Sequence, residues 1–312
     1  PAINVRNLGF EKLMGQGVQV VDDVKKILDS DNPYHQSRAI WLLVRLGNKG
    51  ESIVTDILKN EPDPRLRVAA YRALKNDRES LLKYATIAVD DPSPQVRREV
   101  AISLRDVPWK KSAPLIKELY QGYDGEDRWY LEALGMAMDG KEDIAYAAFL
   151  PDQPKDPANW SDAFASLVWR IHPKAAITAL NERALAVSVP DSLKIRAVDA
   201  LAFIDDKDAV KAMFDLKDSA KDDAVSDLAG WWLDFRKTNN WYALWDWQAE
   251  SGETFDIPEA IAKLKKTLLD KNVPVVERIK AGKEMAGSSI GGRLLISMVV
   301  DEQLSKVIID GV

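Results

Sequence analysis

An internal repeat near the start of the chain constrains the fold more than any other feature. Three windows align without gaps, and each contains a proline followed five residues later by an arginine: Pro33 and Arg38, Pro62 and Arg67, and Pro92 and Arg97. The steps between the prolines are 29 and 30 residues. Repeats of this length are typical of arrays in which one supersecondary unit recurs. The chain is therefore predicted to consist of stacked copies of a short unit.

Each unit is predicted to be a pair of helices. In the second helix of one unit, over residues 65–74, the apolar residues Leu66, Ala70 and Leu74 share one face. A single pair cannot bury such a face alone, so neighbouring pairs must stack. The alternating pattern of strands is absent. The sequence thus predicts an all-α fold of about eight to nine stacked helix pairs, with essentially no strand.

The second helices resemble the HEAT repeat, through the pattern D-x-P-x-x-[VL]-R-x-x-[AV]-[AY]-x-x-L. The HEAT repeat is a two-helix unit that stacks into a curved solenoid, so the resemblance implies a right-handed α-α superhelix (HEAT-like solenoid). The resemblance implies that an aspartate in the turn and an arginine in the second helix bridge neighbouring repeats. These ladder residues would be Asp31, Arg38, Arg67, Asp91 and Arg97. The arginines could instead bind a ligand, but their periodic recurrence favours a role in stacking.

Two longer stretches, residues 32–47 and 274–299, are similar to the HEAT segment of multidomain membrane-bound dehydrogenases. In that family a β-propeller precedes the HEAT segment and a c-type haem-binding domain follows it. The resemblance implies a segment of a larger, periplasmic or exported, oxidoreductase-like protein, with a cytoplasmic location as the alternative. The chain contains no cysteine and hence no Cys-x-x-Cys-His haem motif. The chemistry of the family therefore cannot be placed on any residue here, and no cofactor is expected.

We expect residues 1–312 to form one HEAT-like solenoid. Regular repeats are predicted for 1–138, and divergent repeats for 139–236, which include a proline-rich loop at 150–158. An irregular aromatic segment, 237–257, precedes the terminal repeats at 258–312. Because solenoids normally end in polar capping units and this sequence shows none, the chain is expected to be a piece of a larger protein.

Composition argues against several classes of chemistry. The absence of cysteine excludes thiolate catalysis, and two histidines, His35 and His172, are too few for zinc sites built on several histidines. The net charge of −6 disfavours nucleic-acid binding. No apolar run approaches the roughly 18 residues of a membrane span. We predict no catalytic, cofactor-binding or metal-binding residues in this chain, no nucleic acid as a partner, and no membrane insertion.

Two short motifs match catalytic patterns without their required context. Residues 287–291 match G-x-S-x-G, but an amphipathic helix precedes the serine and both histidines lie far upstream. Residues 80–83 match S-x-x-K, but the partner motifs of the lactamase class are absent. Both are better explained as helix ends, and the chain is predicted not to be an enzyme.

Half of the ten tryptophans lie within one segment, 231–250. The aromatic residues in it that could bind a partner are Trp231, Trp232, Phe235, Trp241, Tyr242, Trp245 and Trp247. They could form a platform for a sugar, a peptide or a neighbouring domain. The alternative, which we favour, is a purely structural role in which these aromatic side chains fill the core where the repeat loses its register.

The sequence favours a non-catalytic scaffold, a protein-interaction or spacer module that links domains. Its partners would be protein domains, including domains of the same polypeptide, and its oligomeric state is left open. One alternative is a HEAT-like DNA glycosylase, which would need a basic groove that the acidic composition does not supply. Another is a carbohydrate-contacting surface on the 231–247 segment.

Overall fold

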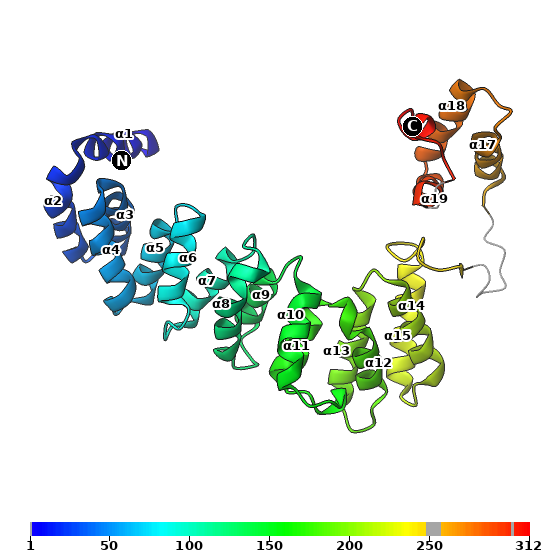
Figure 1. The fold of residues 1–312 in the computed structure, drawn as a ribbon, viewed down its shortest axis with the longest axis horizontal. Helices are drawn as coiled ribbons and strands as arrows, with labels where there is room; N and C mark the ends of the chain where they lie inside the picture. Colours follow the sequence, from blue (N-terminus) through cyan, green and yellow to red (C-terminus); the bar gives the residue numbers. More distant parts are fainter. Residues whose placement is uncertain (1, 248–256, 301–302) are drawn as a thin grey trace. The chain divides into compact units, whose positions relative to one another are not determined.

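The computed structural model describes residues 2–247, 257–300 and 303–312. Of the residues that the structure describes, 74% are helical and none forms a strand. The helices pack against their neighbours in sequence order, as Figure 1 shows within each part of the chain. The predicted all-α, solenoid-like fold is confirmed.

The chain divides into two compact units, residues 1–179 and 180–312. The helices of the N-terminal unit are α1 (Ile3–Gln16), α2 (Val21–Lys26), α3 (Pro33–Leu43), α4 (Asn48–Asn60), α5 (Pro64–Leu74), α6 (Arg78–Ala88), α7 (Pro94–Ser103), α8 (Trp109–Gln121), α9 (Arg128–Ala137), α10 (Glu142–Phe149) and α11 (Asp162–Ile171). Helices α3, α5, α7, α9 and α11 contact one another in succession, while α4 and α6 lie in a second layer. The core lies between these two layers, with Leu43, Val54 and Leu74 among its buried residues.

The second helices of successive pairs begin in the same way. Helices α3, α5 and α7 each start with a proline, Pro33, Pro64 and Pro94. The residue before it caps the helix: the side chain of Asn32, Asp63 or Ser93 accepts a hydrogen bond from the backbone N–H two residues ahead. Such a cap satisfies an N–H group that has no partner inside the helix. Counting from this N-cap residue therefore gives a common register for the repeats.

The C-terminal unit follows the same plan. After α12 (Ile177–Leu185), which spans the division between the units, its helices are α13 (Asp191–Ala202), α14 (Lys207–Ser219), α15 (Asp223–Arg236), α17 (Glu259–Leu269), α18 (Val275–Ala286), α19 (Ser289–Val300) and α20 (Lys306–Ile309). Helices α13, α14 and α15 pack together, and α18 contacts α17, α19 and α20. A second core in this unit includes Leu268, Met285 and Ile308.

The proline-rich loop predicted at 150–158 contains two short 3₁₀ turns, Leu150–Asp152 and Pro157–Asn159. Pro157 is buried, while Pro154 and Lys155 between the turns are exposed. Of the predicted aromatic segment 237–257, residues 248–256 lie outside the described residues. The predicted inner boundaries at 138, 236 and 257 stay a prediction. In the part of the chain that the structure describes, no helix is both long enough and apolar enough to cross a membrane.

Candidate interaction surfaces

A groove runs across three successive second helices of the N-terminal unit. It encloses about 770 Å³, and α5, α7 and α9 line it with Arg65, Val68, Arg72, Gln95, Arg98, Glu99, Ile102, Trp129, Glu132, Ala133 and Met136. Counted from the N-cap residues Asp63, Ser93 and Asp127, these residues all fall at positions 2, 5, 6 and 9. Positions three and four apart share one face of a helix, so each repeat presents the same stripe to the groove.

Four of the five charged residues that line this groove are bridged to a neighbouring helix or its N-cap, and the fifth, Arg65, pairs with Asp63 at the start of its own helix. Arg72 on α5 pairs with Glu99 on α7, and Arg98 on α7 pairs with Asp127 at 3.4 Å. Glu132 on α9 accepts hydrogen bonds from Arg170 on α11 and from Arg128. Burial works to raise the pKa of Glu132, but the hydrogen bonds from these two arginines outweigh it and lower that pKa. These charges are therefore held in place by the protein itself.

The apolar side chains of the groove remain available to a partner. Trp129 is 73% exposed and Ile102 is 38% exposed. An indole at this exposure leaves a large apolar area in water, and clustered aromatic and apolar side chains on a surface mark protein contacts. Trp129 was not among the residues singled out from the sequence, because a lone tryptophan on a repeat helix gives no local signal.

Two ladder residues, Arg67 and Asp91, form a buried ion pair. Arg67 Nε and Nη2 donate to the two Asp91 carboxylate oxygens, each at 2.8 Å. Arg67 Nη1 also donates to the carbonyl oxygens of Glu61 and Pro62 at 2.6 and 3.1 Å. The backbone N–H of Ser93 donates to Asp91 at 2.8 Å. This network links α5 to the turn that begins α7.

Arg97 also bridges neighbouring repeats, but it binds carbonyl and hydroxyl oxygens. It donates to the carbonyl oxygens of Asp91 and Gly122 at 2.7 and 3.1 Å and to the Tyr130 hydroxyl at 3.1 Å. Arg38 and Asp31 are exposed, and within the described ranges their side chains make no hydrogen bond or ion pair. The structure brings Arg67, Asp91 and Arg97 together and leaves Arg38 and Asp31 apart.

The register explains the position of Arg38. Arg67 and Arg97 are the fourth residues after their N-caps, whereas the fourth residue after Asn32 is Gln36. Gln36 Nε2 donates to the Leu28 carbonyl oxygen at 2.9 Å, which parallels the backbone contacts of Arg67. Arg38 lies two positions further along and faces solvent.

The same position in the C-terminal unit is taken by Lys194, which was not recognised from the sequence. Lys194 is the fourth residue after Pro190, the N-cap of α13, and it is buried. Its Nζ atom lies 2.9 Å from Asp191 and 3.2 Å from Asp222, the N-cap residue of α15. The sequence signal that could have identified Lys194 is a basic residue four positions after the N-cap of a helix.

The aromatic segment does not form one surface. Trp241 is fully buried, and its Nε1 donates to the Ile204 carbonyl oxygen at 3.0 Å. Tyr242, Trp245 and Trp247 are half-buried. The ring centroids of Trp245 and Trp247 lie 5.5 and 5.9 Å from that of Phe214. This half of the segment packs against the helices of its own unit.

The other half forms an exposed aromatic patch, which we define as Phe203, Trp231, Trp232 and Phe235. Trp231 and Phe235 are 54% and 47% exposed, and their rings stack with centroids 5.4 Å apart and planes 5° apart. Trp232 is half-buried, its Nε1 donates to Asp199 at 3.0 Å, and its ring lies 5.5 Å from that of Phe203. Phe203, which is also exposed, lies outside the sequence segment and was therefore missed.

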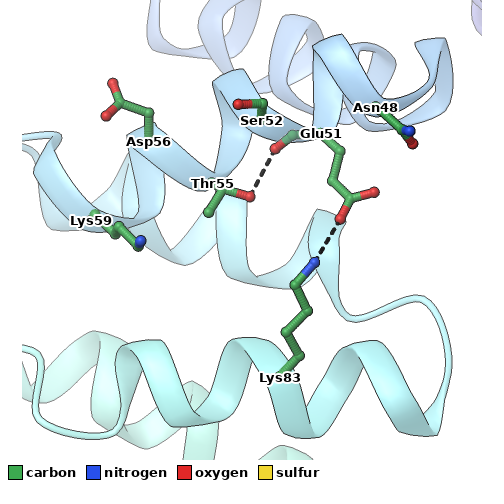
Figure 2. A pocket seen from close by; sticks show the side chains of 7 residues that line it. All are labelled: Asn48, Glu51, Ser52, Thr55, Asp56, Lys59 and Lys83. Atoms are coloured by element: carbon green, nitrogen blue, oxygen red, sulfur yellow. Dashed lines mark hydrogen bonds and ion pairs between the residues drawn. The ribbon is translucent and has the colours of Figure 1, made fainter.

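A polar pocket of about 540 Å³ lies between α4 and α6 (Figure 2). Glu51 accepts hydrogen bonds from Lys83 Nζ at 3.0 Å and from the Tyr84 hydroxyl, and the Thr55 hydroxyl donates to the Glu51 carbonyl oxygen at 2.8 Å. The hydrogen bond from Tyr84 lowers the pKa of Glu51, and hydrogen bonds to Tyr84 and Glu51 raise the pKa of Lys83. Acid–base catalysis needs a group that titrates near the working pH. Both shifts move the pKa values of Glu51 and Lys83 away from neutral pH. The arrangement therefore suits an ionic bridge between two helices better than proton transfer.

Metal binding finds no support in the residues that the structure describes, because no three His, Cys, Asp or Glu side chains gather into a possible ligand set there. His35 is exposed at the start of α3. His172 ends α11 with a φ of 49°, in the left-handed region. The two histidines thus occupy different helix termini.

The comparisons with known proteins leave the function to be argued from these surfaces. No protein-family model matches the chain, and no curated protein shows significant sequence similarity to it.

Proposed function

We propose that this chain is a non-catalytic helical-repeat module of the HEAT type that binds a partner protein along the groove of α5, α7 and α9. The observation that carries the proposal is the 73% exposure of Trp129 within a hollow of about 770 Å³. Tryptophans that become buried in a complex are over-represented among the residues that dominate binding energy. A partner that covers this indole would gain apolar contact area without breaking the core of the repeat.

Because its charges are already paired, the groove is suited to recognise a partner protein by shape and apolar contacts. Because Arg72 and Arg98 are already paired with acids of the next repeat, an approaching partner need not supply matching carboxylates. The bridges also hold the stripes of the three helices in a fixed register. A preformed surface lowers the cost of ordering side chains on binding.

The proposed wider context is a larger, exported oxidoreductase-like protein in which this module links domains. This part of the proposal rests on the resemblance of residues 32–47 and 274–299 to the HEAT segment of multidomain dehydrogenases. The partner in the groove would then be a domain of the same polypeptide. Measuring the intact mass and the cellular compartment of the native protein tests it. A cytoplasmic protein with the 34.9 kDa mass of this chain would contradict it.

Site-specific photo-crosslinking tests the groove itself. A benzoylphenylalanine at position 129 is expected to crosslink to a partner in cells of the source organism. The matched control is position 34, because Tyr34 is an aromatic residue with the same 73% exposure on α3, outside the groove. The captured partner should bind Trp129→Ala more than about tenfold more weakly than wild type. It should bind Tyr34→Ala unchanged, and equal crosslinking from both positions would contradict the proposal.

A further inference from the structure

The strongest unexplained feature of the C-terminal unit is the guanidinium of Arg236, in the last turn of α15. Arg236 is only 7% exposed. Its charged carbon lies 4.8 Å from the ring centroid of Phe203 and 5.6 Å from that of Trp232. In the described part of the chain this guanidinium forms no ion pair and no hydrogen bond, and its Nε atom is buried without a partner.

A buried guanidinium without an anion is costly. Buried charges are normally paired, because removal from water otherwise carries a large desolvation penalty. Burial accordingly lowers the pKa of Arg236, and the charge of Asp205, which raises that pKa, offsets only part of the effect. The two ring contacts offset only part of this cost, since a cation–π contact is weaker than a charged hydrogen bond.

The carboxylates of this region make their hydrogen bonds to side chains other than Arg236. Asp205 accepts a hydrogen bond from Asn240 Nδ2 at 2.8 Å. Asp199 accepts one from Trp232 Nε1, and Asp234 pairs with Lys237 at 2.7 Å. Among the described residues, the guanidinium of Arg236 therefore faces the rings of the aromatic patch with no carboxylate in ion-pair contact, and Asp205 acts on it only through its charge.

We propose that Arg236 and the aromatic patch form a binding site for a single carboxylate on an apolar peptide, that is, a Glu or Asp side chain flanked by apolar residues in a partner protein. The carboxylate would accept hydrogen bonds from the guanidinium, and the flanking apolar groups would cover the exposed rings of Phe203, Trp231 and Phe235. Residues 201–250 contain eleven acidic and six basic residues, a surplus that repels polyanions. This charge favours a peptide with one acid over a nucleic acid or a polyuronate. The site is independent of the groove in the N-terminal unit.

Two matched peptides test the site on the full chain. We expect acetyl-Leu-Glu-Leu-amide to bind roughly ten- to hundredfold more tightly than acetyl-Leu-Gln-Leu-amide, because only the first can form a charged hydrogen bond with the guanidinium. Titration calorimetry gives both affinities. The Nε–H resonance of Arg236, followed by NMR, is expected to shift with the glutamate peptide alone. Sodium acetate, which lacks the apolar groups, is expected to bind more weakly than the glutamate peptide.

Variants separate this site from general effects of charge. Arg236→Gln should abolish the preference for the glutamate peptide, whereas Lys221→Gln, which removes an exposed cation of the same unit, should retain it. Phe203→Ala removes an exposed ring and should weaken both peptides, and it serves as the test if Arg236→Gln does not fold. Equal binding of the two peptides to wild type, no binding of either at millimolar concentration, or an unmoved Arg236 signal would overturn the proposal. If acetate binds as tightly as the glutamate peptide, the proposal that the ligand is a peptide with apolar residues would be overturned.

Discussion

Arg67 and Asp91 are 24 residues apart in sequence, yet two hydrogen bonds of 2.8 Å join their side chains. Both side chains are less than a tenth exposed. Arg67 belongs to α5, and Asp91 belongs to the turn that begins α7, so the pair fixes the position of one repeat against the next. Lys194 and Asp222 make the corresponding contact between α13 and α15. The same device thus occurs in both units with a different cation.

Arg67→Ala is expected to lower the free energy of unfolding by roughly 3–5 kcal/mol, the range for removing one partner of a buried ion pair. The loss arises because Asp91 would keep a buried charge without its cation. Urea unfolding followed by circular dichroism measures it. Arg38→Ala is the matched control, since Arg38 is exposed and should cost almost nothing. Equal losses in both variants would show that the buried pair does not stabilise the array.

Close helix contact at Gly50 leads to a second prediction. A Cβ atom on Gly50 of α4 would lie 2.0 Å from the carbonyl oxygen of Leu43 in α3. Backbone must therefore move, and Gly50→Ala should cost about 1–3 kcal/mol, as overpacking does. Gly9→Ala in α1 is the control, because a Cβ atom on Gly9 would meet nothing within 4 Å and alanine favours the helix. Thermal unfolding compares the two, and an unchanged midpoint for Gly50→Ala would contradict the predicted close approach.

How far the sequence predicts this fold can be seen from the prolines. The repeat in the sequence aligns on Pro33, Pro62 and Pro92, whereas the residues that begin the second helices are Pro33, Pro64 and Pro94. Two prolines in each of the later windows make both alignments possible. The period and the all-α fold do not depend on this choice, but the register of the first window does. The sequence alignment therefore matches Arg38 to Arg67 and Arg97, whereas in the structure the equivalent position is that of Gln36, two residues earlier.

The surfaces depend on contacts that the sequence does not specify. Trp231 and Phe235 are four residues apart and therefore share a helix face, which a helical pattern can reveal. Phe203 joins them only because α13 packs beside α15. Trp241 is buried because its indole reaches Ile204, 37 residues upstream. Tertiary packing of this kind decides which aromatic residues face solvent, and local periodicity cannot supply it.

The hydrogen bonds of Glu51, which join α4 to α6, should make the stability of the protein depend on pH. The hydrogen bond from Tyr84 lowers the pKa of Glu51 below its usual 4.5. A carboxyl with a lowered pKa in the folded state stabilises the protein fully above the unfolded value, and this contribution disappears as the pH falls through the folded value. The stability advantage of wild type over Glu51→Gln should thus be present at pH 7 and shrink below about pH 4.5. Urea midpoints from pH 7 to pH 3 check this, and a constant difference would contradict it.

The loop between α10 and α11 is predicted to be the first site of proteolysis. Pro154 and Lys155 are exposed between two short 3₁₀ turns, and exposed loop tips are preferred sites of nicking. Brief trypsin treatment under native conditions should cut after Lys155 before any helix is cleaved. Lys155→Gln should remove this early product without changing the later ones. Resistance of wild type at this bond would show that the anchored Pro157 holds the whole loop against the unit.

Tryptophan fluorescence should divide the aromatic segment into two environments. Trp241 has no exposed surface, so its emission should be blue-shifted and resistant to acrylamide, whereas the 54% exposure of Trp231 should make its emission red-shifted and quenchable. The difference between wild type and Trp241→Phe, or between wild type and Trp231→Phe, isolates each contribution among the ten tryptophans.

Trp241→Phe also removes the hydrogen bond to Ile204 and should lower stability by roughly 1–3 kcal/mol, because that carbonyl oxygen loses a buried partner. Trp231→Phe should leave stability within about 0.5 kcal/mol of wild type, as expected for an exposed position. Quenching of Trp241 to the same extent as Trp231 would contradict the separation of the segment into core and surface, and with it the aromatic patch as a distinct docking face.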